Sequence, residues 1–212
     1  SLKDKSVSVV PTPPIPPPPS SSPSPVAVLL GVCVCGVRGG GGCVMDAATQ
    51  ASLLLQKQLK DLSKNPVDGF SAGLVDDINI FEWSVTVIGP PDTLYEGGYF
   101  NAIMSFPENY PNSPPSTRFT SEMWHPNVYP DGRVCISILH APGDDPSGYE
   151  LASERWSPVH TVESIVLSII SMLSSPNDES PANIEAAKEW REKRDEFKKK
   201  VSRIVRRSQE ML

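Results

Sequence analysis

The chain has 212 residues, enough for one sizeable domain with a tail, and its hydrophobic fraction of 39% and charged fraction of 21% fit a globular protein. Residues 46–184 carry 18 Asp and Glu against 6 Lys and Arg, whereas residues 185–212 carry 10 Lys and Arg against 6 Asp and Glu. The acidic body argues against a nucleic-acid partner, because such binding needs a surface that neutralises phosphates. The basic end is predicted to be the solvated face of a final helix.

Residues 1–45 differ in composition from the rest and are predicted to be a disordered extension rich in Pro and Gly. Nine of the 23 prolines lie within residues 11–25, where few apolar residues offset the entropy of ordering. The apolar run 26–37 is too short for a membrane-spanning helix, which needs roughly 20 residues, and its proline-rich flank does not fit a signal peptide. Met45 resembles a native start, so we expect residues 1–44 to have no folded role.

Three of the four cysteines lie in this extension, at Cys33, Cys35 and Cys43. Without a His or a second Cys pair nearby, their spacing favours unstructured thiols over a zinc site, and no metal is expected. Cys135 is the remaining cysteine, and a single thiol in the folded part suits a reducing compartment.

A domain over residues 46–212 is predicted to open with a helix from Ala47 to Lys64. Its apolar residues recur at i, i+4 and i+7 on one side, at Leu55, Leu59 and Leu62. Asn65 precedes a proline and therefore ends the helix, because the residue before proline avoids the α conformation. Lys57 and Lys60 lie mostly off the apolar stripe, as a solvated face or a docking surface.

Residues 70–120 are predicted to form an antiparallel strand meander. Apolar and polar residues alternate over residues 81–88, a second strand is expected at 99–106 and a short third one at 116–120. Turn sequences separate them, and strands joined by short loops favour an antiparallel sheet over βαβ units. Together with the helices, this predicts an α+β fold.

Three more helices are predicted towards the C-terminus. Thr161 is expected to cap a buried helix, whose apolar residues are Val162, Ile165, Val166, Ile169, Ile170 and Leu173. Residues 174–177 should break this helix, and two further helices are predicted at 181–190 and 191–207. The last one has an apolar stripe of Phe197, Val201, Ile204 and Val205.

Residues 125–135 hold the candidate chemistry. The Asn127 side chain can donate two hydrogen bonds, and Pro130 to Gly132 predict a tight turn that folds Cys135 back towards it. A nucleophilic sulfur beside a polarising amide suggests acyl transfer. Taken alone, a lone cysteine before an apolar run is more often a small buried hydrophobic residue.

The combination resembles the ubiquitin-conjugating enzyme family. Its signature is His-Pro-Asn, here His125, Pro126 and Asn127, followed eight residues after the Asn by the active-site cysteine, here Cys135. Further family marks are Gly89-Pro90, Tyr95-Glu96-Gly97-Gly98 and Tyr110-Pro111-x-x-Pro114-Pro115. The resemblance implies a fold with an N-terminal helix, a four-stranded antiparallel meander and C-terminal helices.

The same resemblance implies the reaction. Cys135 would take ubiquitin as a thioester from an activating enzyme and pass it, with a ligase, to a lysine of a substrate or of another ubiquitin. Asn127 would stabilise the oxyanion, whereas His125 and Pro126 would hold the loop. No cofactor is expected to bind, since ATP is used by the activating enzyme.

An insertion follows Cys135 and resembles that of the G-type subgroup, which is associated with polyubiquitin chains for degradation. With two Pro and two Gly, residues 140–150 predict a mobile surface loop. His140, Asp144 and Asp145 in this loop, and Ser180 at the family's Asp-or-Ser position, are candidates to act near the incoming lysine. A tolerated acidic loop and a structural His140 are the alternatives.

Partners also follow from the resemblance. The first helix, with Lys57 and Lys60, would meet the activating enzyme and the ligase. The ligase, expected to be of RING type, would also contact the loops around Asn112 and around Trp156, Ser157 and Pro158. Many members carry an apolar residue at the position of Asn112, which leaves the choice of ligase open.

We expect neither nucleic-acid binding nor membrane insertion, and a location in the cytoplasm, in the nucleus or at the endoplasmic reticulum surface through a partner. Three other readings remain. A noncatalytic ubiquitin-binding relative would lack Cys135, and a cysteine hydrolase would need a His base aimed at the sulfur, for which only His140 is near in sequence. Conjugation of a different ubiquitin-like modifier is the third.

Overall fold

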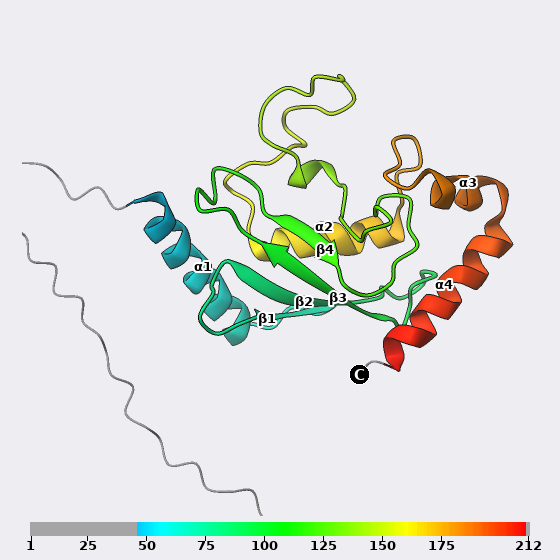
Figure 1. The fold of residues 1–212 in the computed structure, drawn as a ribbon, viewed down its shortest axis with the longest axis horizontal. Coiled ribbons are helices and arrows are strands. Elements are labelled where there is room, and N and C mark those ends of the chain that lie inside the picture. The colour runs from blue at the N-terminus through cyan, green and yellow to red at the C-terminus, as the bar shows by residue number, and fades with distance from the viewer. Residues whose placement is uncertain (1–45, 211–212) are drawn as a thin grey trace, which may run out of the picture. The chain divides into compact units, whose positions relative to one another are not determined.

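The computed structural model describes residues 46–210, and the predictions for residues 1–45 lie outside this range. Figure 1 shows a sheet with helices at both of its ends and on one face. The elements in chain order are α1 (Ala47–Lys64), β1 (Phe70–Leu74), β2 (Glu82–Ile88), β3 (Tyr99–Ser105), β4 (Ser116–Phe119), the 3-10 helix η1 (Ser137–Leu139), α2 (Val162–Ser174), α3 (Ile184–Glu192) and α4 (Arg194–Gln209).

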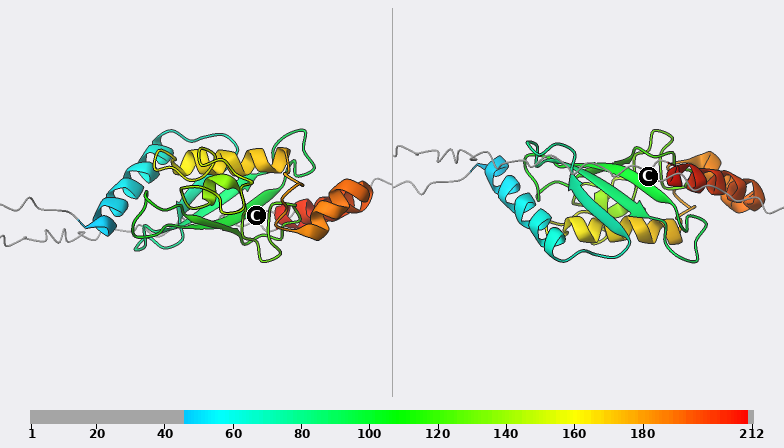
Figure 2. Two further views of the ribbon diagram at one scale, coloured as in Figure 1. Left: turned by 90° about the horizontal axis from the view of Figure 1, so that it is seen from above. Right: turned by 90° about the horizontal axis from the view of Figure 1, so that it is seen from below.

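The sheet is an antiparallel meander in the order β1-β2-β3-β4. This confirms the predicted α+β fold, and β1 is the fourth strand. In β2, Trp83, Val85 and Val87 are buried, while Glu82 and Ser84 between and beside them are exposed. This alternation buries one face of the sheet, and α2 runs along that side (Figure 2).

The core joins the buried face of the sheet to α2 and the terminal helices. Its largest fully buried side chains include Trp83, Phe100, Met104, Ile165, Ile169 and Phe197. Thr161 caps α2 as predicted, in a capping box with Ser164. The α1 helix has the predicted bounds, and Asp46 caps it by accepting the Thr49 N–H at 2.6 Å.

The C-terminal helices begin later than predicted. The α3 helix starts at Ile184 because the Asn183 side chain caps it by accepting the Ala186 N–H at 3.0 Å. The break between α3 and α4 lies at Lys193, where the backbone leaves the helical conformation, and α4 continues to Gln209. Within residues 46–210, no helix is both long and apolar enough to cross a membrane.

Candidate active site

A tight turn brings Cys135 back against Asn127. The Gly132 N–H donates to the Tyr129 carbonyl at 2.9 Å, and the Cys135 N–H donates to the Asn127 carbonyl at 2.9 Å. Gly132 has a φ of 89°, and a Cβ there would lie 2.3 Å from the Phe119 carbonyl oxygen. The turn therefore requires glycine at this position, as the sequence suggested.

His125 and Pro126 connect this loop to the helices. The His125 Nδ1 accepts the Asn127 N–H at 2.9 Å, so the Nε2 carries the hydrogen and donates to the Met172 carbonyl at 3.1 Å. Burial lowers the pKa of His125 to about 4, so its ring is neutral at physiological pH. The Pro126 carbonyl accepts the Asn183 N–H at 2.9 Å. Both residues hold the loop.

The Asn127 side chain clamps the loop between α2 and α3. Its Nδ2 donates to the Asn177 carbonyl at 2.7 Å, and its Oδ1 accepts the Asn177 N–H at 2.8 Å. The Ser180 N–H in turn donates to the Asn177 Oδ1 at 3.4 Å. One N–H of the Asn127 amide is left for a substrate oxygen.

Cys135 is half-buried and has two polar neighbours. The Tyr129 hydroxyl lies 4.0 Å from its Sγ, and the His140 Nε2 lies 3.6 Å from the same sulfur. Burial raises the pKa of the Cys135 thiol, and the Tyr129 hydrogen bond only partly counteracts this. Burial therefore favours the thiol over the thiolate in the uncharged enzyme.

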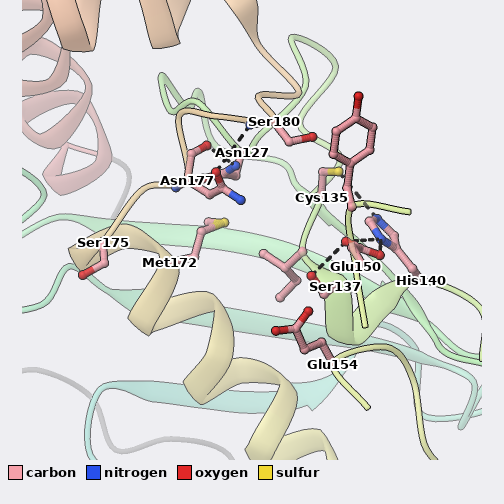
Figure 3. A pocket seen from close by; sticks show the side chains of 12 residues that line it. Asn127, Cys135, Ser137, His140, Glu150, Glu154, Met172, Ser175, Asn177 and Ser180 are labelled. Atoms are coloured by element: carbon pink, nitrogen blue, oxygen red, sulfur yellow. Dashed lines mark hydrogen bonds and ion pairs between the residues drawn. The ribbon is translucent and has the colours of Figure 1, made fainter. Parts of the chain in front are cut away.

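Glu150 orients His140. The His140 Nδ1 lies 2.9 Å and 2.8 Å from the two carboxylate oxygens of Glu150 (Figure 3). The Ser137 Oγ donates to that carboxylate at 2.8 Å and the Arg155 Nη1 at 3.0 Å. Burial opposes ionisation of Glu150, but the hydrogen bonds from His140 and Ser137 and the charge of Arg155 lower its pKa overall. The result is a Cys–His–Glu arrangement.

Sequence reasoning missed this arrangement. It noted His140 as the histidine near Cys135 in sequence, but it singled out neither Glu150 nor its partners Ser137 and Arg155 as site residues. No spacing rule links a histidine to an acid ten residues further along an irregular loop. The one available sign was a His and several acids in an insertion directly after the cysteine.

The loop acids lie elsewhere than predicted. Asp145 accepts the N–H groups of Ser147 and Tyr149, at 3.1 Å and 2.7 Å, and lies 3.6 Å from Arg155. The two backbone hydrogen bonds are the main reason why the pKa of Asp145 is lowered. Asp144 is exposed. Neither lines the cavity beside Cys135, and the contacts of Asp145 stabilise the loop itself.

Two cavities meet at the sulfur. One, of about 400 Å³, is lined by Asn127, Cys135, His140, Asn177 and Ser180 among others (Figure 3). The second, of about 360 Å³, lies on the side of Tyr129 and Arg133 and also reaches Cys135 and His140. An acyl group on the sulfur and an incoming nucleophile can therefore approach from different sides.

The predicted partner-binding residues are divided between surface and core. Lys57 and Lys60 on α1, Asn112 and Pro158 are exposed, and Ser157 is half-buried. Trp156 is 2% exposed and donates its indole N–H to the Pro111 carbonyl at 2.8 Å. It joins the two expected ligase loops from beneath, so the prediction that Trp156 itself contacts the ligase does not fit its burial. Val159, which is 80% exposed, is the large apolar side chain that these loops present.

A half-buried cysteine on this turn, above an antiparallel meander flanked by helices, fits an acyl transferase that works through its thiol. The chain belongs to the ubiquitin-conjugating enzyme family, whose sequence model, described as "Ubiquitin-conjugating enzyme", matches residues 54–205. It therefore accepts ubiquitin as a thioester from an activating enzyme and transfers it with a ligase. Enzymes of this class generally act without a bound cofactor.

Individual relatives point to the G-type subgroup. "Ubiquitin-conjugating enzyme E2 7" of Arabidopsis thaliana is 87% identical over 164 residues, which cover 77% of this chain and 99% of that protein. "Ubiquitin-conjugating enzyme E2 G2" of Homo sapiens is 58% identical over 154 residues, or 73% of this chain and 93% of the relative. The structure of human "Ubiquitin-conjugating enzyme E2 G1" superposes with a TM-score of 0.54 at 54% identity, covering 62% of this chain and 99% of that one.

Proposed function

We propose that this enzyme builds degradation-type ubiquitin chains with a RING-type ligase and that His140 receives the proton of the incoming amine. The observation that carries the second part is the position of the His140 Nε2, 3.6 Å from the Cys135 Sγ, with Nδ1 held by Glu150. A carboxylate at Nδ1 keeps the hydrogen on that nitrogen, so the Nε2 lone pair faces the reaction centre.

The transfer needs two kinds of assistance. The lysine must lose a proton near neutral pH, and His140, whose Nε2 lies 3.6 Å from the Cys135 Sγ, is the candidate base beside the sulfur. The carbonyl oxygen becomes negatively charged during attack, and the remaining amide N–H of Asn127 is the candidate donor. Ser180 lines the same cavity and is exposed, where it can hydrogen-bond the incoming amine.

Chain building requires a second ubiquitin to bind beside the thioester. Two large apolar side chains are exposed in and directly after the inserted loop, since Tyr149 is 84% exposed and Leu151 is 67% exposed. Tyr149 also lines the cavity that contains Cys135. Exposed apolar side chains at the entrance of a site are suited to hold a protein acceptor.

The location follows from the partners. We infer that the enzyme works in the cytoplasm or the nucleus, or at the endoplasmic reticulum surface when a ligase recruits it there. A fluorescent fusion with and without its ligase, followed by fractionation, tests this inference.

A charging assay tests the proposal as a whole. With ubiquitin, activating enzyme and ATP, the wild-type enzyme should form an adduct that thiol reagents remove and that Cys135→Ala lacks. With a RING ligase, it should then form linked ubiquitin chains, and mass spectrometry of the linkages should find the degradation type. His140→Ala should still charge but should discharge to lysine at least tenfold more slowly. Unchanged discharge by this variant would remove His140 from the mechanism, and chains of other linkages would refute the chain-building role.

A further inference from the structure

The Cys135, His140 and Glu150 side chains form an arrangement that could serve nucleophiles weaker than lysine. A thioester is already activated, and a lysine amine attacks it once the ammonium has lost its proton. A base oriented by a carboxylate, as His140 is by Glu150 at 2.8 Å and 2.9 Å, is what a weaker nucleophile requires. The weaker nucleophiles available in proteins are the hydroxyl groups of serine and threonine.

The reason is the acidity of an alcohol. A hydroxyl group does not ionise at neutral pH, so its proton must be removed while it attacks the carbonyl. A neutral imidazole within reach of the reacting oxygen can remove this proton, as in hydrolases with a Ser-His-Asp triad. The same imidazole then returns the proton to the leaving group.

We propose that the charged enzyme transfers ubiquitin to serine and threonine hydroxyl groups as well as to lysine, with His140 as the base for this reaction. In this step the hydroxyl oxygen attacks the thioester carbonyl and the O–H proton passes to the His140 Nε2. The C–S bond then breaks, and the proton passes from Nε2 to the Cys135 thiolate. The products are an ester and the free thiol. The proposal rests on the basic role of His140 proposed above.

The site gives a hydroxyl group access to this base. The His140 side chain is 35% exposed, and the two cavities of about 400 and 360 Å³ both reach Cys135 and His140. A serine or threonine side chain is short, so its backbone must come close to the sulfur. The openings on both sides of Cys135 allow this approach.

Glu150 is held firmly enough to keep His140 oriented. Its side chain is 19% exposed, and it receives hydrogen bonds from Ser137 at 2.8 Å and from Arg155 at 3.0 Å. Arg155 is itself fixed by donating from its Nε to the Ala141 carbonyl at 2.8 Å. The base is thus supported by the ion pair between Glu150 and Arg155.

A discharge experiment with small acceptors tests the proposal without a ligase. The full chain is charged with ubiquitin, ATP is removed, and Nα-acetyl-lysine, Nα-acetyl-serine or Nα-acetyl-threonine is added in separate reactions. Intact-mass spectrometry measures each ubiquitin adduct, and hydroxylamine distinguishes an ester, which it cleaves, from an amide. The variants are His140→Ala and Glu150→Gln, with Glu192→Gln as the control, since Glu192 is an exposed acid at the end of α3.

We expect a hydroxylamine-sensitive serine or threonine adduct from the wild-type enzyme and from Glu192→Gln. His140→Ala should lower the rate of ester formation by at least tenfold, and by a larger factor than the rate of lysine discharge. Glu150→Gln should lower ester formation in the same sense. No ester from the wild-type enzyme, while His140→Ala still slows lysine discharge, would overturn the hydroxyl inference and leave the proposed function intact. Ester formation that is equal with and without His140 would overturn the role of the base.

Discussion

Replacing Asn127 by alanine separates two roles that the structure combines in one amide. The substitution removes the hydrogen bonds of 2.7 Å and 2.8 Å to the backbone of Asn177 and also the N–H available to an oxyanion. Each neutral hydrogen bond contributes about 1 kcal/mol. Because Asn177 is exposed, water can replace the lost partner, and the free energy of unfolding should fall by about 2 kcal/mol. For a domain of this size, that corresponds to a decrease in Tm of about 4–8 °C.

The effect on transfer should be larger than the effect on stability. Removing one oxyanion donor slows acyl transfer by about 10²–10³-fold. Charging of Cys135 exchanges one thioester for another and should remain largely intact. The assay is single-turnover discharge of the charged enzyme to lysine, alongside the rate of charging. An equal loss in both steps would refute the oxyanion role.

The structure also offers a control for loop movement. The Asn177 Oδ1 accepts the N–H groups of Glu179 at 3.1 Å and Ser180 at 3.4 Å. Asn177→Ala therefore loosens the same loop but leaves the Asn127 amide in place. If Asn177→Ala slows discharge as much as Asn127→Ala does, the amide acts only by holding the loop.

Three further predictions concern stability. Gly132→Ala should destabilise the domain by about 2 kcal/mol or more and reduce charging, because its Cβ meets the Phe119 carbonyl. Gly143 also has a positive φ but lies in open space, so Gly143→Ala should destabilise the domain less than Gly132→Ala does. Denaturant unfolding of the two variants measures this difference. His125 has a pKa of about 4 when folded against 6.5 for an ordinary histidine, so the unfolded chain binds more protons as the pH falls from 6.5 to 4. The free energy of unfolding should therefore fall by about 3 kcal/mol over this pH window, and it should fall less in His125→Gln. Identical pH profiles of stability for the wild type and this variant would contradict the prediction. Deleting residues 1–44 should leave Tm and activity unchanged, and a large loss in either would refute the prediction that they have no folded role.

Local sequence determined the regular elements of this protein. The sequence signals of these elements are local, because each involves residues close together in the chain. Examples are the leucine spacing and the Asn65-Pro66 end of α1, the Thr161 cap of α2 and the alternation in β2. Their physical causes are therefore visible without any tertiary contact. The turn before Cys135 is similar, because Gly132 provides the positive φ that the turn requires. These features placed the nucleophile and Asn127 correctly.

Only the tertiary structure decided which side chains face the sulfur and which are buried. His140 and Glu150 meet because Arg155 and Ser137 hold Glu150 in an irregular loop. Such a loop has no periodic pattern from which this contact could be predicted. The Asn127 clamp joins residues 50 positions apart. Trp156 lies in a sequence expected at the surface but is buried beneath two loops. Such contacts depend on long-range packing, in which no residue specifies its partner by sequence spacing. Sequence alone therefore pointed to Cys135, whereas packing decided that His140 and Glu150 lie beside it.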